Sequence, residues 1–145
     1  DQEEALATSD LVAVMYQGRV VQFDTPARLY TEPADPWVAD FLGDADVFSA
    51  TGHRGYADTI LGRFRTDLRG PVHVVVRPED VRLSIGETPN AVVSSTEFFG
   101  HDQLVTVTLP GGVVVRSRIG PRPQYSPGDK VRARADHARV FAART

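Results

Sequence analysis

The order of apolar and polar residues divides the chain into two parts with different patterns. Residues 11–18, LVAVMYQG, form a continuous apolar run, which is typical of a strand buried on both faces of a larger sheet. Gln17 and Gly18 offer a turn, and residues 19–26, RVVQFDTP, continue as a second strand. Residues 1–10, DQEEALATSD, place acidic residues ahead of alanine and leucine, so they are expected to form a helix.

Two short helices are predicted after this hairpin, each from a capping residue that is followed by proline. Thr25 and Asp35 can accept hydrogen bonds from the free amides of a helix start, and the prolines behind them need no partner there. Gly43 is placed to end the second helix. One face of that helix is expected to be apolar and buried, through Trp37, Val38, Phe41 and Leu42.

From about Asp46 onward, short stretches alternate apolar and polar residues, with Gly or Pro at intervals of about eight to twelve residues. This pattern is typical of a small antiparallel β sandwich or barrel, and the strand around Val74 is expected at its core. We therefore predict a mainly β fold in two domains, residues 1–45 and 46–145. Inward-facing positions are predicted at Val105, Val107, Leu109, Val113, Val115 and Ile119.

Composition limits the classes of function. The chain has 145 residues, a formal net charge of −3 and 41% hydrophobic residues, which is ordinary for a globular protein with a core. It contains no cysteine, so disulfides and thiolate sites are excluded and a reducing cytoplasm is the expected location. No apolar run approaches the roughly 20 residues that cross a bilayer, so we expect no direct membrane insertion.

Residues 1–43 contain Asp-Gln-x-Glu-Ala, a Val-Met strand, a Gly-Arg turn, a Thr-Pro helix and a Pro-Trp helix that ends at glycine. In this order they resemble the C-terminal portion of ATP-binding subunits of bacterial ABC importers. Residues 74–83, 95–109 and 126–136 resemble the transport-associated OB (TOBE) domain that is appended to such subunits. The resemblance implies an OB-like barrel or sandwich, preceded by an α/β remnant of a nucleotide-binding domain.

The motifs that carry ATP hydrolysis in that family are not found in the sequence. It has no G-x-x-x-x-G-K-[ST] loop, no apolar strand that ends in a magnesium-binding aspartate and no Ser-Gly-Gly-Gln-like signature. The family's switch histidine is expected immediately before Asp1. We therefore expect an excised piece that is not an enzyme and has no catalytic, cofactor-binding or metal-binding residues, with ATP and Mg²⁺ bound by the parent ATPase.

One candidate site is the block Arg77, Pro78, Glu79 and Asp80. Proline cannot donate to a strand ladder, so Pro78 is expected to end a strand and to turn the chain. By resemblance this block is a structural hallmark of the β domain. Its expected place is near the junction with the ATPase domain or with a second subunit, and a direct ligand role is the alternative.

The second candidate is the block Phe98, Phe99 and Gly100. Consecutive residues of one strand point to opposite faces, so one of the two phenylalanines covers a second layer or an interface. We expect both of them, like Trp37, to lie in the core or at a domain junction.

Basic residues alternate along two of the predicted strands. Arg116 and Arg118 share one face of the first, and Lys130, Arg132 and Arg134 share one face of the second. If these strands are neighbours, five cations lie on one face, and OB folds bind oligonucleotides. A nucleic-acid face usually adds aromatic residues for base stacking, so a solvated face that pairs with acidic residues is the preferred interpretation.

The four histidines do not show the i, i+4 or short-loop spacing of a metal site. We expect surface or turn residues rather than ligands at His53, His73, His101 and His137.

The main functional hypothesis is a regulatory and dimerisation module. The family implies a second copy of the chain as partner and, through the ATPase domain, membrane permease subunits at the inner face of the cell membrane. The transported substrate is expected to be ferric iron, a polyamine or similar. The alternative is a free-standing OB-like module that binds a small oxyanion or nucleic acid.

One surface of the α/β part is expected to need a cover. Residues 11–23 present an apolar strand without the neighbouring strands of a larger sheet, and such an edge invites pairing. We expect a second copy, or the β domain of the same chain, to cover it.

Overall fold

The computed structural model describes residues 2–143, so Asp1 of the expected opening helix lies outside the described residues. The chain divides into two compact units, Asp1–Ala45 and Asp46–Thr145. The first unit contains α1 (Gln2–Thr8), β1 (Val12–Tyr16), β2 (Arg19–Asp24), α2 (Pro26–Thr31) and α3 (Pro36–Phe41). Within the described residues, no helix is long and apolar enough to cross a membrane.

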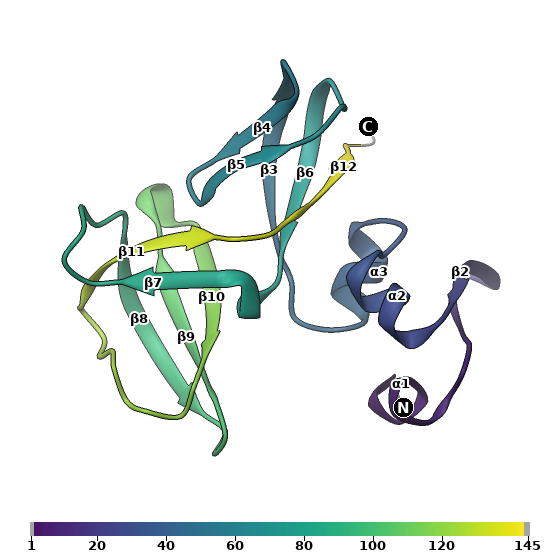
Figure 1. Ribbon diagram of the computed structural model, residues 1–145, viewed down its shortest axis with the longest axis horizontal. Coiled ribbons are helices and arrows are strands. Elements are labelled where there is room, and N and C mark those ends of the chain that lie inside the picture. Colours follow the sequence, from purple (N-terminus) through teal and green to yellow (C-terminus); the bar gives the residue numbers. More distant parts are fainter. Residues whose placement is uncertain (1, 144–145) are drawn as a thin grey trace. The chain divides into compact units, whose positions relative to one another are not determined.

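In the first unit, β1 and β2 form an antiparallel hairpin (Figure 1). Gln17 and Gly18 make the turn with φ of 49° and 77°, the left-handed pair that matches the twist of a two-residue hairpin. Both predicted caps are confirmed. The Val38 amide donates to Asp35 Oδ1 at 2.9 Å and the Arg28 amide donates to Thr25 Oγ1 at 3.4 Å, with proline next in each helix.

Residues 11–18, whose pattern is typical of a strand buried on both faces of a larger sheet, lie in this chain in a two-stranded hairpin. The hairpin has only two strands, so one face packs against the helices through Val14, while Met15 and Tyr16 remain exposed. Phe41 is also exposed rather than buried, and it stacks on Trp37 with ring centroids 5.0 Å apart. The covering of this hairpin by a second copy stays a prediction.

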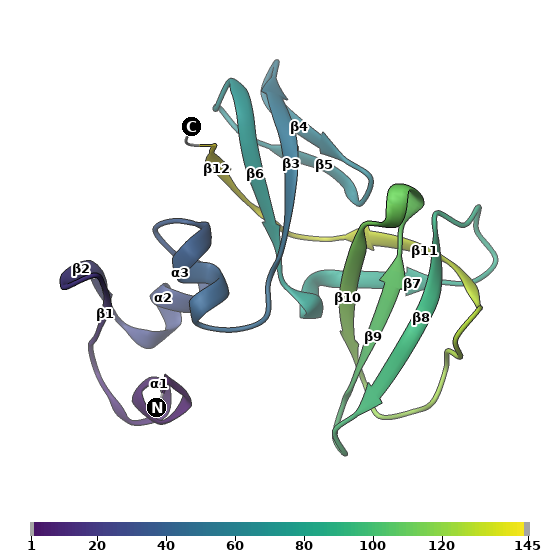
Figure 2. The ribbon, with the colours of Figure 1, turned by 180° about the vertical axis from the view of Figure 1, so that it is seen from behind.

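The second unit consists of two antiparallel five-stranded sheets (Figures 1 and 2). The order of the first sheet is β12-β6-β3-β4-β5. Its strands are β3 (Asp46–His53), β4 (Tyr56–Thr59), β5 (Gly62–Arg65), β6 (Gly70–Val76) and β12 (Arg139–Ala142).

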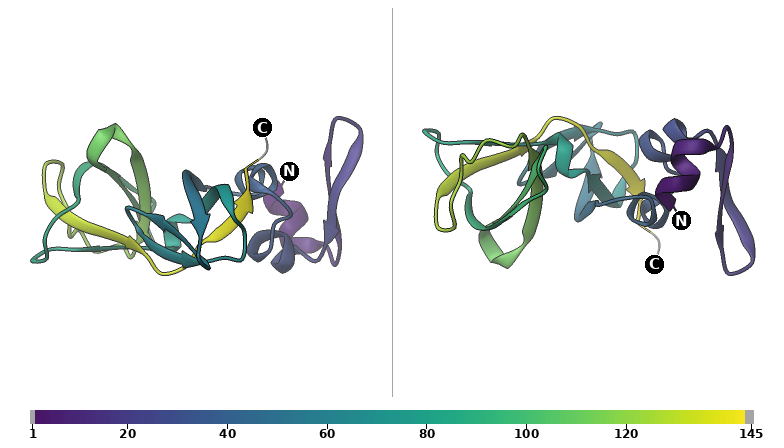
Figure 3. Two further views of the ribbon diagram at one scale, coloured as in Figure 1. Left: turned by 90° about the horizontal axis from the view of Figure 1, so that it is seen from above. Right: turned by 90° about the horizontal axis from the view of Figure 1, so that it is seen from below.

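The order of the second sheet is β10-β9-β8-β11-β7, and this sheet curls (Figure 3). Its strands are β7 (Val81–Ser84), β8 (Ala91–Phe98), β9 (Gln103–Thr108), β10 (Val114–Ile119) and β11 (Lys130–Ala135). Two short 3₁₀ helices, η1 (Pro78–Asp80) and η2 (Pro110–Gly112), lie between strands.

Two chain segments run through both sheets and join them. β6 continues through η1 into β7, and β11 continues into β12. These segments pair with each other in each sheet, β6 with β12 and β7 with β11. Burial on the inner faces follows the predicted alternation, so Val105, Val107 and Val115 are fully buried. Val113 is an exception, because it precedes β10 and is 46% exposed.

Candidate functional site

The Arg77–Asp80 block forms the crossing between the two sheets. Pro78 ends β6 and starts η1, as its missing amide hydrogen favours. The amide of Asp80 donates to the Arg77 carbonyl at 3.0 Å and closes the 3₁₀ turn. Arg77 and Pro78 are buried, whereas Glu79 and Asp80 are only half-buried. This places the two acidic side chains at the surface of the crossing.

Charged groups tie this crossing to the other one, where β11 passes into β12. The Asp136 amide donates to the Asp80 carbonyl at 2.9 Å, and Arg82 Nε lies 2.7 Å from Asp136 Oδ2. Arg82 Nη1 also donates to the Glu79 carbonyl at 3.1 Å. The two segments that join the sheets are therefore fastened to each other at the point where both change sheet.

Burial raises the pKa of Asp80 above its ordinary value. The positive charges of His137 and Arg82 lower this pKa. The carboxylates of Glu79 and Asp136 raise it. A carboxyl with a raised pKa binds its proton more tightly in the folded chain than in the unfolded one. The contribution of the Asp80 carboxyl to the free energy of unfolding is therefore complete at low pH, and it is lost as the pH rises through the raised pKa.

At neutral pH the half-buried Asp80 carboxyl is ionised, and its burial makes that charge unfavourable for folding. Replacement of Asp80 by asparagine should remove this unfavourable contribution. We expect the D80N variant to melt at a slightly higher temperature than the parent at pH 7, with the difference vanishing below about pH 3, where aspartate is protonated. Thermal unfolding followed by circular dichroism across this range measures the difference. D67N, at an exposed loop position, is the matched control, and an equal shift in both variants would contradict the role of burial.

The Phe98–Gly100 block lies at the turn between β8 and β9. Phe98 is the last residue of β8, Phe99 lies beyond it, and Gly100 has φ of +96°. The Phe99 amide donates to the Asp102 carbonyl at 2.9 Å and closes the turn. Neither phenylalanine lies in the core of this unit, since Phe98 is 65% and Phe99 48% exposed. Their expected place at a junction or interface stays a prediction. A turn at the end of a hairpin extends beyond the core that the strands share.

The exposed phenylalanines are flanked by opposite charges. The Arg118 guanidinium lies 5.7 Å from the centroid of the Phe99 ring, and Arg118 Nη1 lies 3.1 Å from Asp102 Oδ2. Glu97 and His101 are exposed beside them. We call the surface of Glu97, Phe98, Phe99, His101 and Arg118 the hairpin-tip surface.

The five predicted cations do not share one face through neighbouring strands, because β9 and β8 separate β10 from β11. The preferred interpretation, pairing with acidic residues, is confirmed for three of them. Arg116 binds Asp46 at 3.2 Å, Arg118 binds Asp102, and Arg134 binds Glu87 at 3.1 Å. Sequence patterns could not give these pairs, since Asp46 and Glu87 lie far from their partners in the chain.

Two polar residues that organise the unit were missed in the sequence. Asn90 donates to the Ala133 carbonyl at 2.9 Å and accepts from the Ala133 amide at 2.7 Å, so its side chain extends the pairing of β8 with β11. Gln103 is buried and donates to the carbonyls of Gly120 and Arg122 at 2.9 and 2.7 Å. A single Asn just before a strand, or a single Gln at the start of one, carries no pattern that marks such a role.

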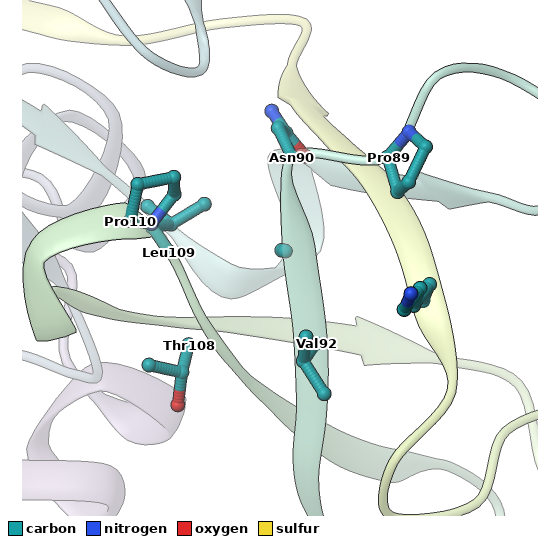
Figure 4. A pocket seen from close by; sticks show the side chains of 8 residues that line it. Pro89, Asn90, Val92, Thr108, Leu109 and Pro110 are labelled. Atoms are coloured by element: carbon teal, nitrogen blue, oxygen red, sulfur yellow. The ribbon is translucent and has the colours of Figure 1, made fainter.

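A shallow, mainly apolar depression lies between the start of β8 and the end of β9 (Figure 4). Its walls include Pro89, Val92, Leu109 and Pro110, and Thr108 and Lys130 supply polar groups. Among residues 2–143, no group of three or more His, Asp or Glu side chains is arranged to hold a metal ion. The predicted exposure of His101 is confirmed, with 88% of its side chain accessible.

Comparison with known proteins identifies the family. A sequence profile of the TOBE domain matches residues 74–142. The chain is 33% identical to the Fe(3+) ions import ATP-binding protein FbpC of Serratia marcescens, over 98% of this chain and 44% of that protein. It is 36% identical to the spermidine/putrescine import ATP-binding protein PotA of Ruegeria pomeroyi, over 90% of this chain and 40% of that protein. The chain thus spans less than half the length of these relatives.

A solved structure supports the fold. The cytoplasmic molybdate-binding protein ModG, in a crystal form with molybdate bound, aligns with a TM-score of 0.53 over 68% of this chain and 96% of that chain. The two share only 18% sequence identity, so the likeness concerns the OB-like fold alone. Residues 74–142 therefore belong to the TOBE domain family, in a chain whose curated relatives are ATP-binding subunits of ABC importers.

Proposed function

We propose that this chain acts as a regulatory and dimerisation module within the ATP-binding subunit of a bacterial ABC importer. The observation that carries the proposal is the extent of similarity. The two importer subunits match 98% and 90% of the chain, so the likeness extends beyond the TOBE residues 74–142 into the α/β unit. A free-standing binding module of OB type would not need that unit.

In this proposal the chemistry belongs to the whole subunit. ATP and Mg²⁺ bind to the nucleotide-binding domain, and ATP hydrolysis there drives the permease subunits in the membrane. The chain contributes the exposed face of the β1–β2 hairpin, which includes Met15, Val20 and Phe23, as a surface for the rest of that domain. The transported substrate is ferric iron, a polyamine or a related solute, following the names of the relatives.

The TOBE domain is proposed to hold two subunits together while their ATPase domains open. The hairpin-tip surface supports this role because it combines two exposed phenyl rings with the cation of Arg118 and the exposed carboxylate of Glu97. In a twofold-symmetric contact the same patch meets itself, so the cation of one copy can face the carboxylate of the other. Such a contact raises the effective concentration of one ATPase domain for its partner.

Sedimentation velocity of the purified chain tests this contact. We expect self-association at high protein concentration. We expect the F98D/F99D variant to raise the dissociation constant about 100-fold, since a carboxylate then replaces each ring that the proposed contact would bury. The matched control is I85D, because Ile85 is also exposed, at 64%, but lies outside the hairpin-tip surface. A parent chain that remains monomeric, or equal effects of both variants, would refute dimerisation through this surface.

A further inference from the structure

One corner of the first sheet of the β unit carries four exposed arginines. The Thr66 amide donates to the Gly55 carbonyl at 3.0 Å, so the end of β5 lies against the turn between β3 and β4. The four arginines belong to that turn, to β5 and to the loop before β6. We call them the arginine edge: Arg54, Arg63, Arg65 and Arg69.

The charges of the arginine edge are unequally compensated. Arg63 Nε lies 2.7 Å from Asp58 Oδ1. The guanidinium groups of the other three arginines make no ion pair or hydrogen bond within residues 2–143. Residues 53–69 hold four arginines and two aspartates, although the formal net charge of the whole chain is −3. This corner is therefore a positive region of an acidic chain.

The turn presents its arginine in an uncommon backbone conformation. Arg54 has φ of 53° and Gly55 has φ of 86°, the left-handed pair of a two-residue hairpin. Asparagine, aspartate or glycine usually fills such a position, because a longer L side chain is strained there. Strained positions at a surface often carry function. The strain at Arg54 is thus a second reason to look for a partner at this corner.

The backbone of β5 has an open side. β5 is the last strand of its sheet and pairs with β4 (Figure 1). Because Thr66 bonds to Gly55, and hydrogen-bonded pairs alternate along an antiparallel ladder, Phe64 also bonds to β4. The N–H and C=O groups of Arg63 and Arg65 therefore point away from β4. Among the described residues these groups have no partner on the open side.

The side chains of β5 limit which strand can pair with this open side. Phe64 faces the core, whereas Arg63 and Arg65 lie on the outer, exposed face. A second copy of β5 would place arginine opposite arginine, and like charges in that position are destabilising. A strand with a carboxylate at every second position would instead place opposite charges beside both arginines.

We propose that the open side of β5 binds an extended acidic segment of another protein as an added strand. The backbone of the segment pairs with the free N–H and C=O groups of Arg63 and Arg65. Its carboxylates, two residues apart, contact the guanidinium groups on the outer face. Arg54 and Arg69 extend the positive surface to the flanking residues of the segment. The contact does not involve the hairpin-tip surface and does not depend on the proposed role in an importer.

Two other anionic partners fit the arginine edge less well. Single-stranded nucleic acid gains affinity when bases stack on free aromatic side chains. The exposed ring at this corner is Tyr56, and the Arg63 guanidinium already lies 5.1 Å from its centroid. An anionic membrane attracts basic side chains, but it makes no use of free strand N–H and C=O groups. The open side of β5 therefore favours a polypeptide.

The test is the binding of a fluorescein-labelled heptapeptide, EVETEVE, to the purified chain, followed by fluorescence anisotropy at constant ionic strength. We expect saturable binding that weakens with added sodium chloride. The R65E variant should raise the dissociation constant about tenfold or more, because attraction becomes repulsion. R122E is the matched control, since Arg122 is also exposed but lies in the loop between β10 and β11. It should bind as the parent does.

Two further measurements separate strand pairing from attraction between charges. In ¹⁵N NMR spectra of the complex, the Arg63 and Arg65 amides should exchange with solvent about tenfold or more slowly than in the free chain. The same peptide, methylated on its backbone nitrogens, keeps its carboxylates but loses its donors, so it should bind about tenfold more weakly. Equal binding of the methylated peptide would overturn strand pairing.

The remaining arms decide the class of partner and the surface. Oligothymidylate of equal charge and vesicles that contain phosphatidylserine should both bind more weakly than EVETEVE, and tighter binding of either would overturn the assignment to a polypeptide. Absence of saturable peptide binding, or equal dissociation constants for R65E and R122E, would overturn the surface itself. Melting temperatures of both variants show whether each one is folded.

Discussion

Replacement of Gly52 by alanine should lower the free energy of unfolding by about 3 kcal/mol. Gly52 lies in β3, between Ala57 of β4 and Gly70 of β6. A Cβ atom on Gly52 would lie 2.1 Å from the Leu68 carbonyl oxygen and 2.9 Å from its carbon. Both are backbone atoms, so no side-chain rotation relieves the overlap and the loop before β6 has to move.

Urea denaturation followed by tryptophan fluorescence and by circular dichroism measures this change. Circular dichroism is needed because Trp37 lies in the first unit and reports only on its own surroundings. G120A is the matched control, because a Cβ on Gly120 meets nothing within 4 Å. Equal midpoints for G52A and G120A would show that the Leu68 loop yields without cost and would contradict the expectation.

The need for glycine at position 52 illustrates a limit of sequence reasoning. The strands of the β unit are predictable, because Val105 and Val107 alternate with threonines and because one face of each strand has to be buried. The approach of the Leu68 carbonyl depends on a loop that returns over β3 from a distant part of the chain. Glycine gives no periodic signal, so only the folded arrangement identifies this contact.

The β1–β2 hairpin shows a different limit. The apolar run at residues 11–18 predicts burial on both faces, but only Val14 of β1 is buried within this chain. Hydrophobicity records what a segment buries in its complete protein, whereas the structure of one chain shows only the partners that the chain supplies. Exposure of Met15 and Tyr16 is therefore compatible with the proposed contact to the rest of a nucleotide-binding domain.

The sequence indicates some of the surroundings of the candidate residues but not others. Pro78 was expected to end a strand, and it does so at the crossing between the sheets. The place of Phe98 and Phe99 at a hairpin tip could not be predicted, because a pattern of residue types does not show where a hairpin extends beyond the core. Arg134 was identified as one of several cations, but its ion pair with Glu87 follows only from the folded arrangement.

Replacement of Asn90 by alanine is expected to have the second large effect on stability, a loss of about 2 kcal/mol. The Asn90 side chain donates to the Ala133 carbonyl and accepts from the Ala133 amide, and it also lies 3.4 Å from the Ile60 carbonyl of the other sheet. Alanine would leave the amide and carbonyl of Ala133, a fully buried residue, without these partners. A backbone group that loses its partner away from water carries its full desolvation cost.

Two further variants test whether the loss of stability comes from the Asn90 side chain itself or follows from any substitution in or beside β8. S94A removes an exposed hydroxyl of β8 that donates to the Thr106 carbonyl of β9, and its effect should stay within about 0.5 kcal/mol. N90D keeps the acceptor for the Ala133 amide but places a carboxylate oxygen against the Ala133 carbonyl, so it should destabilise the unit about as much as N90A. If N90A unfolds at the same urea concentration as S94A, water replaces the amide at this position. The pairing of β8 with β11 would then rest on its backbone hydrogen bonds and on the packing of Val93 and Val131.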